Sequence, residues 1–120
     1  MNHPARDMYE VMDMWGAWAA TENSGVDWSP IAAGFKGLIP HGKKSRPQCT
    51  DVEGIMIDGC VGRLKQYKPE EYGLVMAHFV LGISLRAIAK QRKCSDGTIR
   101  KDMQTALGFI NGCLAIFNYL

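Results

Sequence analysis

Six basic side chains within residues 84–101 form the largest basic cluster of this 120-residue sequence, and the same stretch carries one acid, Asp96. Ser84 and Ser95 each stand where a serine side chain can cap the free amides of a helix start. They predict two helices, over 85–91 and from 96 onward, joined by the short turn 92–94. Two helices joined by such a tight turn are typical of a helix-turn-helix, which places its second helix in the major groove of DNA.

The outward face of the second helix follows from its apolar positions. If Ile99 and Met103 face the core, Arg100 and Gln104 face outward one turn apart. Arginine can pair bidentately with guanine and glutamine with adenine, so these two are the candidates for reading bases. The remaining candidates would contact DNA phosphates, either with their side chains or through the backbone amides at the start of the second helix. They would supply affinity rather than specificity. These candidates are Arg86, Lys90, Arg92, Lys93, Ser95, Gly97, Thr98 and Lys101.

A second basic segment lies over residues 36–46, which carry four bases and no acid. Most of them fall in a predicted loop over 37–49, which is punctuated by glycine and proline. Loops of about a dozen residues in a compact domain are usually functional or mobile. The bases are Lys36, Lys43, Lys44 and Arg46.

The elements that must position these residues all have helical periodicity or helix-start signals. Thr50 and Glu53 form a capping box at the start of one helix, and Pro69 begins the next. The sequence therefore predicts an all-α fold: a compact multi-helix domain over residues 1–120 with a long C-terminal helix and a helix-turn-helix over about 84–106. The expected helices span 5–20, 30–36, 51–66, 69–82, 85–91 and 96–120.

Composition excludes several classes of protein. A hydrophobic fraction of 47% with 22% charged residues is typical of a globular domain. No apolar run is long enough to span a membrane, and the first ten residues lack a signal peptide, so we expect a cytoplasmic protein. The four cysteines and three histidines form no zinc-type ligand pairs. Because no catalytic motif is present either, we expect no enzyme, no metal and no cofactor.

Several runs of residues are more specific than the helix-turn-helix. They are Trp15–Ala20 (WGAWAA), Ser29–Leu38 (SPIAAGFKGL), Ile57–Cys60, Arg63–Lys65, and Gly82–Lys90 with Cys94–Lys101. These runs cover nearly the whole chain. They resemble the late-gene antitermination protein Q of lambdoid phages and prophages, in its short branch rather than the lambda type.

The resemblance implies a role in the host bacterial cell. Such proteins bind a DNA element beside the late promoter and engage RNA polymerase that is paused with sigma bound. They then modify the RNA-exit channel, so that nascent RNA threads through and terminators are read through. A second copy on the DNA is a further candidate partner. On this interpretation the residues that line the RNA path are Lys36, Lys43, Lys44, Arg46, Arg63 and Lys65.

Two other functions stay open on sequence alone. A conventional helix-turn-helix repressor or activator would bind a site and remain there, usually as a symmetric dimer on an inverted repeat. A protein-interaction module would dock its basic hairpin on an acidic surface and would bind no duplex at low salt. An ordinary αα-hairpin with solvated basic side chains is the corresponding structural alternative.

Overall fold

The structure, a computed structural model, describes residues 7–23, 29–35, 37–40 and 46–117, and all regular secondary structure in these ranges is helical. No strand occurs in these ranges, which confirms the all-α prediction. The elements are α1 (Met8–Trp18), the π-helical turn η1 (Ala19–Asn23), α2 (Ser29–Gly34), α3 (Asp51–Tyr67), α4 (Pro69–Val75), the π-helical turn η2 (Met76–Val80), α5 (Leu85–Gln91) and α6 (Asp96–Ile116).

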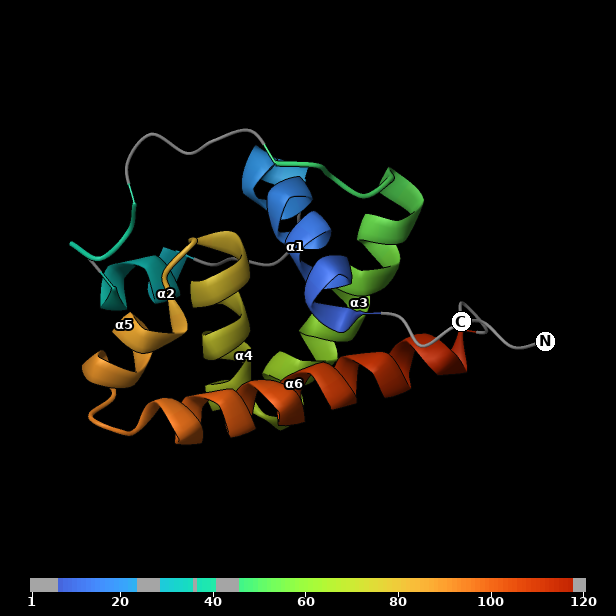
Figure 1. Cartoon of the computed structure of the whole chain (residues 1–120). Coiled ribbons are helices and arrows are strands. Elements are labelled where there is room, and N and C mark those ends of the chain that lie inside the picture. The colour runs from blue at the N-terminus through green and yellow to red at the C-terminus, as the bar shows by residue number, and fades with distance from the viewer. Residues whose placement is uncertain (1–6, 24–28, 36, 41–45, 118–120) are drawn as a thin grey trace.

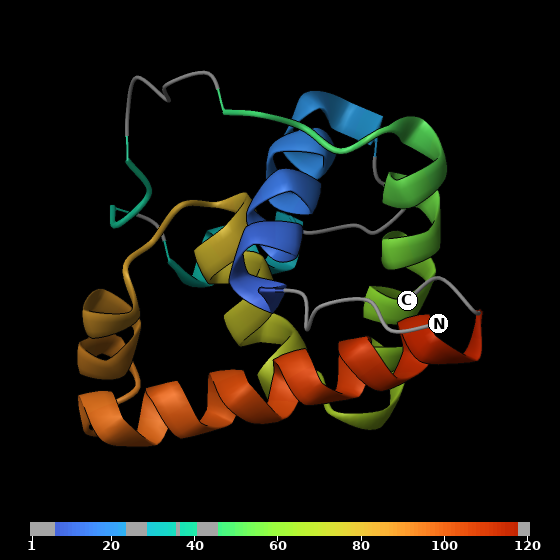
Figure 2. The same cartoon turned by 45° about the vertical axis from the view of Figure 1, so that its right-hand side comes forward.

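The long helix α6 lies across one side of the molecule, and the other helices pack along it (Figures 1 and 2). Helices α3 and α4 contact its middle and second half, while α5 contacts its beginning. Helix α1 crosses η2 and packs against α3. The predicted long C-terminal helix is therefore present, and it connects the helix-turn-helix at one end to the body of the protein. No helix within the described ranges has the length and apolar character needed to cross a membrane.

One face of α1 is buried in the core. Met12 and Trp15 are fully buried, and Trp18 is 3% exposed. The Trp18 indole Nε1 donates a 2.9 Å hydrogen bond to the Asp51 carboxylate at the start of α3. A Cβ atom at Gly54 would collide with the Trp18 ring, so close packing of α1 on α3 requires a glycine there.

The predicted helix over 69–82 is helical as far as Val80, but its second half is not an α-helix. The α-helix ends at Val75 and widens into η2, where the Leu81 amide donates to the Met76 carbonyl over five residues at 3.0 Å. Gly82, at φ +77°, then ends the helical path. Periodicity cannot reveal such a change, because a π-turn keeps the apolar residues inside while shifting the carbonyls.

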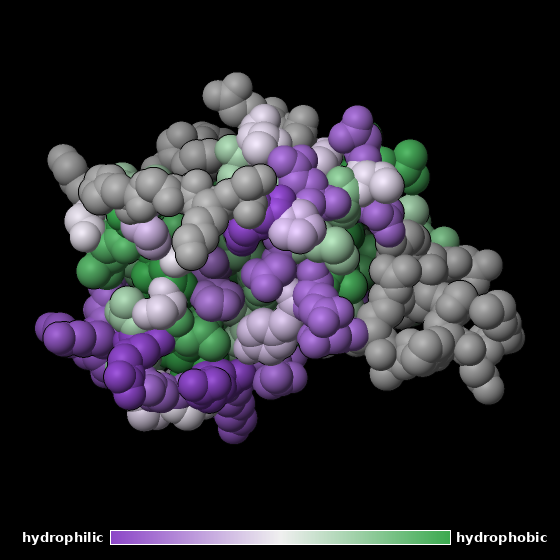
Figure 3. Space-filling view, turned by 45° about the horizontal axis from the view of Figure 1, so that its top comes forward, coloured by the Kyte–Doolittle hydropathy of each residue, from purple (hydrophilic) through white to green (hydrophobic). Residues whose placement is uncertain are grey.

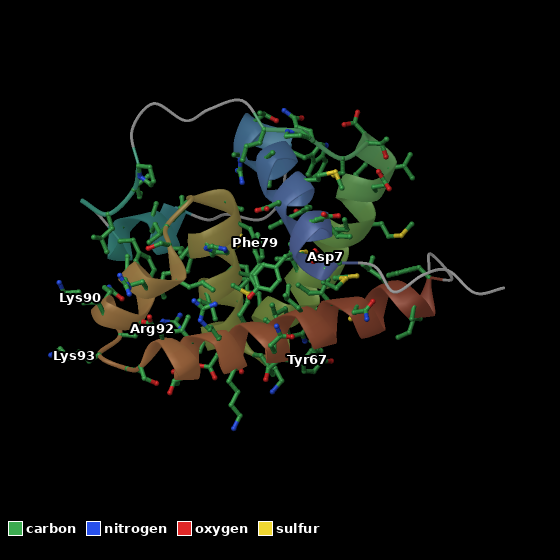
Figure 4. The ribbon with its side chains drawn as sticks, in the orientation of Figure 1. Asp7, Tyr67, Phe79, Lys90, Arg92 and Lys93 are labelled. Atoms are coloured by element: carbon green, nitrogen blue, oxygen red, sulfur yellow. The ribbon has the colours of Figure 1, made fainter. Side chains whose placement is uncertain are left out.

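The carbonyl group of Phe79 is a point of close contact between η2 and α1. A Cβ atom at Gly16 would overlap this carbonyl group, so only glycine fits at this position of α1. The rings of Tyr9 and Phe79 also meet, with centroids 5.8 Å apart. Figure 4 shows Phe79 in the middle of the molecule, next to α1. The close crossing of α1 over η2 therefore requires a residue without a Cβ atom at position 16, which is Gly16.

Gly16→Ala tests this contact. We expect the substitution to lower the free energy of unfolding by about 3 kcal/mol, because the added methyl has a rigid backbone carbonyl as its neighbour. The measurement is urea denaturation followed by circular dichroism. Gly59→Ala is the matched control: its Cβ would have no neighbour within 4 Å, so it should stabilise α3 by roughly 0.5–1 kcal/mol. Equal stability of the two variants would contradict the proposed close contact.

Candidate nucleic-acid interface

Two serine caps define the helix-turn-helix, as the sequence predicts. The Ser84 hydroxyl accepts a 3.1 Å hydrogen bond from the Ala87 amide at the start of α5. The Ser95 hydroxyl does the same for the Thr98 amide at the start of α6, also at 3.1 Å. The helix boundaries match the prediction, with α5 ending at Gln91 and α6 beginning at Asp96.

The turn between the two helices closes without a glycine. Lys93 takes the left-handed conformation, at φ 58°, where glycine is usually found. Its amide donates to Lys90 at 3.1 Å, and the Cys94 amide donates to Ala89 at 3.0 Å. These two bonds make a Schellman motif, which satisfies the last carbonyls of α5. Lys93 and Cys94 therefore form a tight turn without glycine. Lys93 takes a left-handed conformation that is strained for a residue with a Cβ atom.

The two helices pack through the apolar residues expected of them. Ile88 and Ala89 of α5 and Ile99 and Met103 of α6 are buried. The opposite face is hydrophilic, and Figure 3 shows strongly hydrophilic side chains gathered over α5 and the start of α6, at the lower left. Most sequence candidates lie on this exposed surface, namely Arg86, Lys90, Lys93, Ser95, Gly97, Thr98, Arg100, Lys101 and Gln104.

Arg92 is placed differently from the other basic candidates. It is half-buried, and its Nη2 donates a 3.0 Å hydrogen bond to the Glu70 carbonyl at the start of α4. The neighbouring Gln91 donates through Nε2 to the Gly34 carbonyl of α2, at 3.0 Å. These contacts hold the turn onto α4 and α2. The geometry therefore gives Arg92 a role in positioning the helix-turn-helix.

The two flanks of α6 differ in their surroundings. Gln104 lines a cavity of about 320 Å³ together with Asp7, Tyr9 and other residues of α1 and α6. Burial raises the pKa of Tyr9, and the positive charge of Arg100 opposes this rise. On the other flank, Thr98 lines a cavity of about 400 Å³ beside α4. The base-reading candidates Arg100 and Gln104 therefore lie on the α1 side of the recognition helix.

The RNA-path candidates fall into three groups. Lys36, Lys43 and Lys44 lie outside the described residues. Arg46 is half-buried, with both terminal nitrogens 3.2 Å from the Phe79 carbonyl oxygen and Nη1 4.0 Å from the Asp13 carboxylate. Arg46 therefore bonds the segment before α3 to the Phe79 carbonyl of η2, which also contacts Gly16 of α1. No sequence pattern indicated this structural role. The third group, Arg63 and Lys65, is exposed near the end of α3.

The cysteines and histidines of the described ranges do not assemble a metal site. No group of three His, Cys, Asp or Glu side chains there lies close enough to hold a metal ion. The four cysteines are free thiols. Cys60 of α3 is buried. This burial is the main cause that raises the pKa of its thiol to about 12, and the neighbouring Cys113 of α6 is the second cause. The His78 Nδ1 atom lies 2.8 Å from the Ile83 carbonyl oxygen.

Comparison with known proteins identifies the family. The family model described as phage antitermination protein Q matches residues 5–119. This chain belongs to the antitermination protein Q family. It is 50% identical over 112 residues to the probable antitermination protein Q of Acyrthosiphon pisum secondary endosymbiont phage 1, an alignment that covers 92% of this chain and 76% of the relative. It is 46% identical over 109 residues to antitermination protein Q of Escherichia phage 933W, covering 91% and 76%.

Solved structures of antitermination protein Q share the fold. Transcription antitermination factor Q21 superimposes with a TM-score of 0.67 at 17% identity, over 96% of this chain and 93% of that chain. The same factor in complex with Q21-binding-element DNA gives a TM-score of 0.65 at 16% identity, over 98% of each chain. At this level of identity the likeness shows the fold alone.

Lys93→Gly separates the conformation of the turn from its charge. Glycine should raise the free energy of unfolding by about 1 kcal/mol, because the left-handed conformation is strained for a residue with a Cβ atom. Lys93→Ala is the matched control, since it removes the same charge and keeps the strain. Thermal or urea unfolding of both variants gives the comparison. A glycine variant no more stable than the alanine variant would mean that Lys93 is not in this conformation.

Proposed function

We propose that this member of the antitermination protein Q family binds duplex DNA beside a late promoter through α5 and α6. It then loads onto paused RNA polymerase and alters the RNA-exit channel, so that pauses and terminators are read through. The observation that carries the DNA-binding step is a capped, rigidly mounted recognition helix whose exposed first turns present Arg100, Lys101 and Gln104. The solved complex of factor Q21 with its binding-element DNA supports the same use of the fold.

In this proposal the beginning of α6 enters the major groove. Gly97 and Lys101 occupy the outward face, and Arg100 with Gln104 approach base edges from the α1 side. Arg86, Lys90 and Lys93 lie on α5 and the turn, where they meet the phosphates on one side of the groove. The pair between Arg86 Nε and Asp96, at 3.8 Å, involves an arginine side chain that is 88% exposed. Such an exposed pair is weak, so Arg86 can exchange it for a phosphate.

The polymerase contacts in this proposal lie on other surfaces. The exposed acids Glu10 and Asp13 of α1 would suit a basic protein surface. At the far end of α6, Ile116 is 77% exposed and Phe117 is 50% exposed, which is unusual for adjacent large apolar side chains. We assign these two surfaces to RNA polymerase or sigma.

Transcription in vitro tests the antitermination step. The template carries a late promoter, its flanking element and a downstream intrinsic terminator. We expect the protein to increase read-through several-fold, and only when the flanking element is present. The double variant Arg100→Ala, Gln104→Ala should lose this effect while keeping its fold, because both side chains are exposed. Altered initiation with unchanged termination would instead identify a conventional regulator.

Single substitutions test how the recognition helix reads DNA. Arg100→Ala should weaken binding to the loading element by about 1–3 kcal/mol and affect an unrelated duplex much less, because it removes a base contact. Lys101→Ala should weaken binding to both duplexes alike and lower the salt slope by about one, because it removes a phosphate contact. Fluorescence anisotropy over a salt series measures both quantities. Equal loss on the two duplexes for Arg100→Ala would exclude it as a base reader.

A further inference from the structure

We propose that the outer face of α3 pairs with the same face of a second copy of this chain, with the two helices antiparallel and crossing at Gly59. The fold leaves two large apolar side chains of this face in solvent: Val52 is 72% exposed and Ile55 is 66% exposed. Exposed apolar side chains that share one helix face are typical of an interaction surface. Such pairing goes beyond the proposed function and does not depend on it.

The outer face of α3 is centred on Gly59. Six further residues lie within about 60° of the Gly59 direction around the helix axis; they are Val52, Ile55, Met56, Gly62, Arg63 and Gln66. The opposite side of α3 is buried through Ile57, Val61 and Leu64. Figures 1 and 2 show α3 at the edge of the molecule away from α5. The outer face is therefore an unpartnered helix face within one copy.

The glycines of α3 differ in what one copy explains. Gly54 is required by the Trp18 ring, whereas a Cβ atom at Gly59 or Gly62 would have no neighbour within 4 Å. Glycine inside a helix is destabilising relative to alanine, so these two positions are unfavourable for an isolated copy. The distance between two packed helices depends on the side chains at their contact, and glycine there permits a close approach. A helix pair that crosses at Gly59 would use both glycines.

The residues of the outer face are arranged symmetrically about Gly59. In an antiparallel pair that crosses there, each residue comes opposite the residue that lies equally far on the other side of position 59. The resulting pairs between the two copies are Val52 with Gln66, Ile55 with Arg63, and Met56 with Gly62. Each apolar side chain thus meets a glycine or the stem of a long polar side chain, which can cover it while the polar end stays in water. A two-fold symmetric interface requires this kind of self-complementarity.

The charges along α3 also favour the antiparallel arrangement. Asp51 and Glu53 lie in the first turn, and Arg63 and Lys65 lie in the second half of the helix. Antiparallel pairing brings Arg63 within two residues of Glu53 of the second copy, and Lys65 within two residues of Asp51 of the second copy. Both carboxylates accept a hydrogen bond within their own chain, and a carboxylate can accept several. A parallel pair would instead place acids beside acids and bases beside bases, which is unfavourable.

The other acids near α3 lie off its outer face. Asp58 is half-buried and lies about 100° from the Gly59 direction. Glu70 and Glu71 belong to the first turn of α4, after the chain has turned at Lys68. Glu71 is half-buried, and Glu70 lines the cavity that Arg92 also lines. The centre of the face therefore carries one charged side chain, that of Arg63.

Pairing through α3 leaves the recognition surface of each copy exposed. Helix α3 packs beside the second half of α6, where the ring centroids of Tyr67 and Phe109 are 6.5 Å apart. Phe109 lies thirteen residues beyond Asp96, which is about 20 Å along α6 from the start of the recognition helix. A paired copy can therefore still present α5 and the first turns of α6 to DNA.

The size of the face indicates how stable the pair would be. Helix α3 has 17 residues and is about 25 Å long. A contact along one helix of this length is smaller than the standard interface of about 800 Å² per partner. We therefore expect a weak dimer whose population depends on protein concentration.

Sedimentation equilibrium of the whole chain tests the pairing, over roughly 10 μM to 1 mM so that weak association is seen. We expect the average mass to rise toward that of a dimer. Ile55→Lys should raise the dimer Kd roughly tenfold or more, because it places a positive charge opposite Arg63 of the second copy. Ile116→Lys is the matched control, since it makes the same change at an isoleucine of α6 that is 77% exposed. Its Kd should stay within about twofold of that of the unchanged protein.

A charge reversal tests the antiparallel register. Adding Arg63→Glu to Ile55→Lys should return the Kd to within about threefold of the unchanged protein, because the new lysine then faces a glutamate of the second copy. The two positions are eight residues apart on α3, which is about 12 Å along the axis and too far for a pair within one chain. Circular dichroism checks that every variant keeps its helices.

The opposing outcomes are distinct. A monomer at every concentration would overturn the proposal and leave the face to a different protein. A dimer that survives Ile55→Lys, or one that Ile116→Lys weakens equally, would show that the interface lies elsewhere. Masses above that of a dimer, or failure of the charge reversal, would refute the two-fold antiparallel pair. Read-through is measured separately, so failure of the proposed function leaves these masses unchanged.

Discussion

The carbonyl group of Phe79 is the contact on which the arrangement of the helices depends. It belongs to the π-turn η2. Gly16 of α1 leaves room for it, and Arg46 donates to it from the segment before α3. Three parts of the chain that are distant in sequence therefore meet at one oxygen atom. Because η2 leads within a few residues into α5, this junction also determines where the helix-turn-helix begins.

The helix-turn-helix is held by polar contacts on its own periphery as well as by its core. Arg92 bonds to the Glu70 carbonyl, and Gln91 bonds to the Gly34 carbonyl. Both acceptors belong to other helices, so α5 cannot rotate independently of α2 and α4. A mounting of this kind is what a recognition helix needs, since base-reading side chains must be positioned before DNA is bound.

Basic and acidic side chains of this protein lie on different surfaces, although its net charge is small. The net charge is +2, yet basic side chains concentrate on α5, the turn and the start of α6, while exposed acids lie along α1. A uniformly basic protein would bind nucleic acid through any face. The proposed function would use this division, because one basic surface would face DNA and other faces would be left for protein partners.

Local sequence signals determined most of the helices and the exposed positions of most candidate DNA-binding residues. Serine caps, a capping box and apolar periodicity act between residues a few positions apart, so the predicted limits of α5 and the start of α6 agree with the structure. The outward positions of Arg100, Lys101 and Gln104 follow from helix geometry once the buried side is known. The runs that resemble the antitermination protein Q family indicated the family that the comparison shows.

Only the tertiary structure decided the roles of several arginines and glycines. Arg46 and Arg92 are basic residues in basic segments, yet each bonds to a backbone carbonyl more than twenty positions away in sequence. Gly16 and Gly54 are required by close contacts, whereas Gly59 has none. The π-turn η2 is equally invisible to periodicity. In each case the deciding contact joins groups that are far apart along the chain, and no local pattern records which backbone atoms folding will bring together.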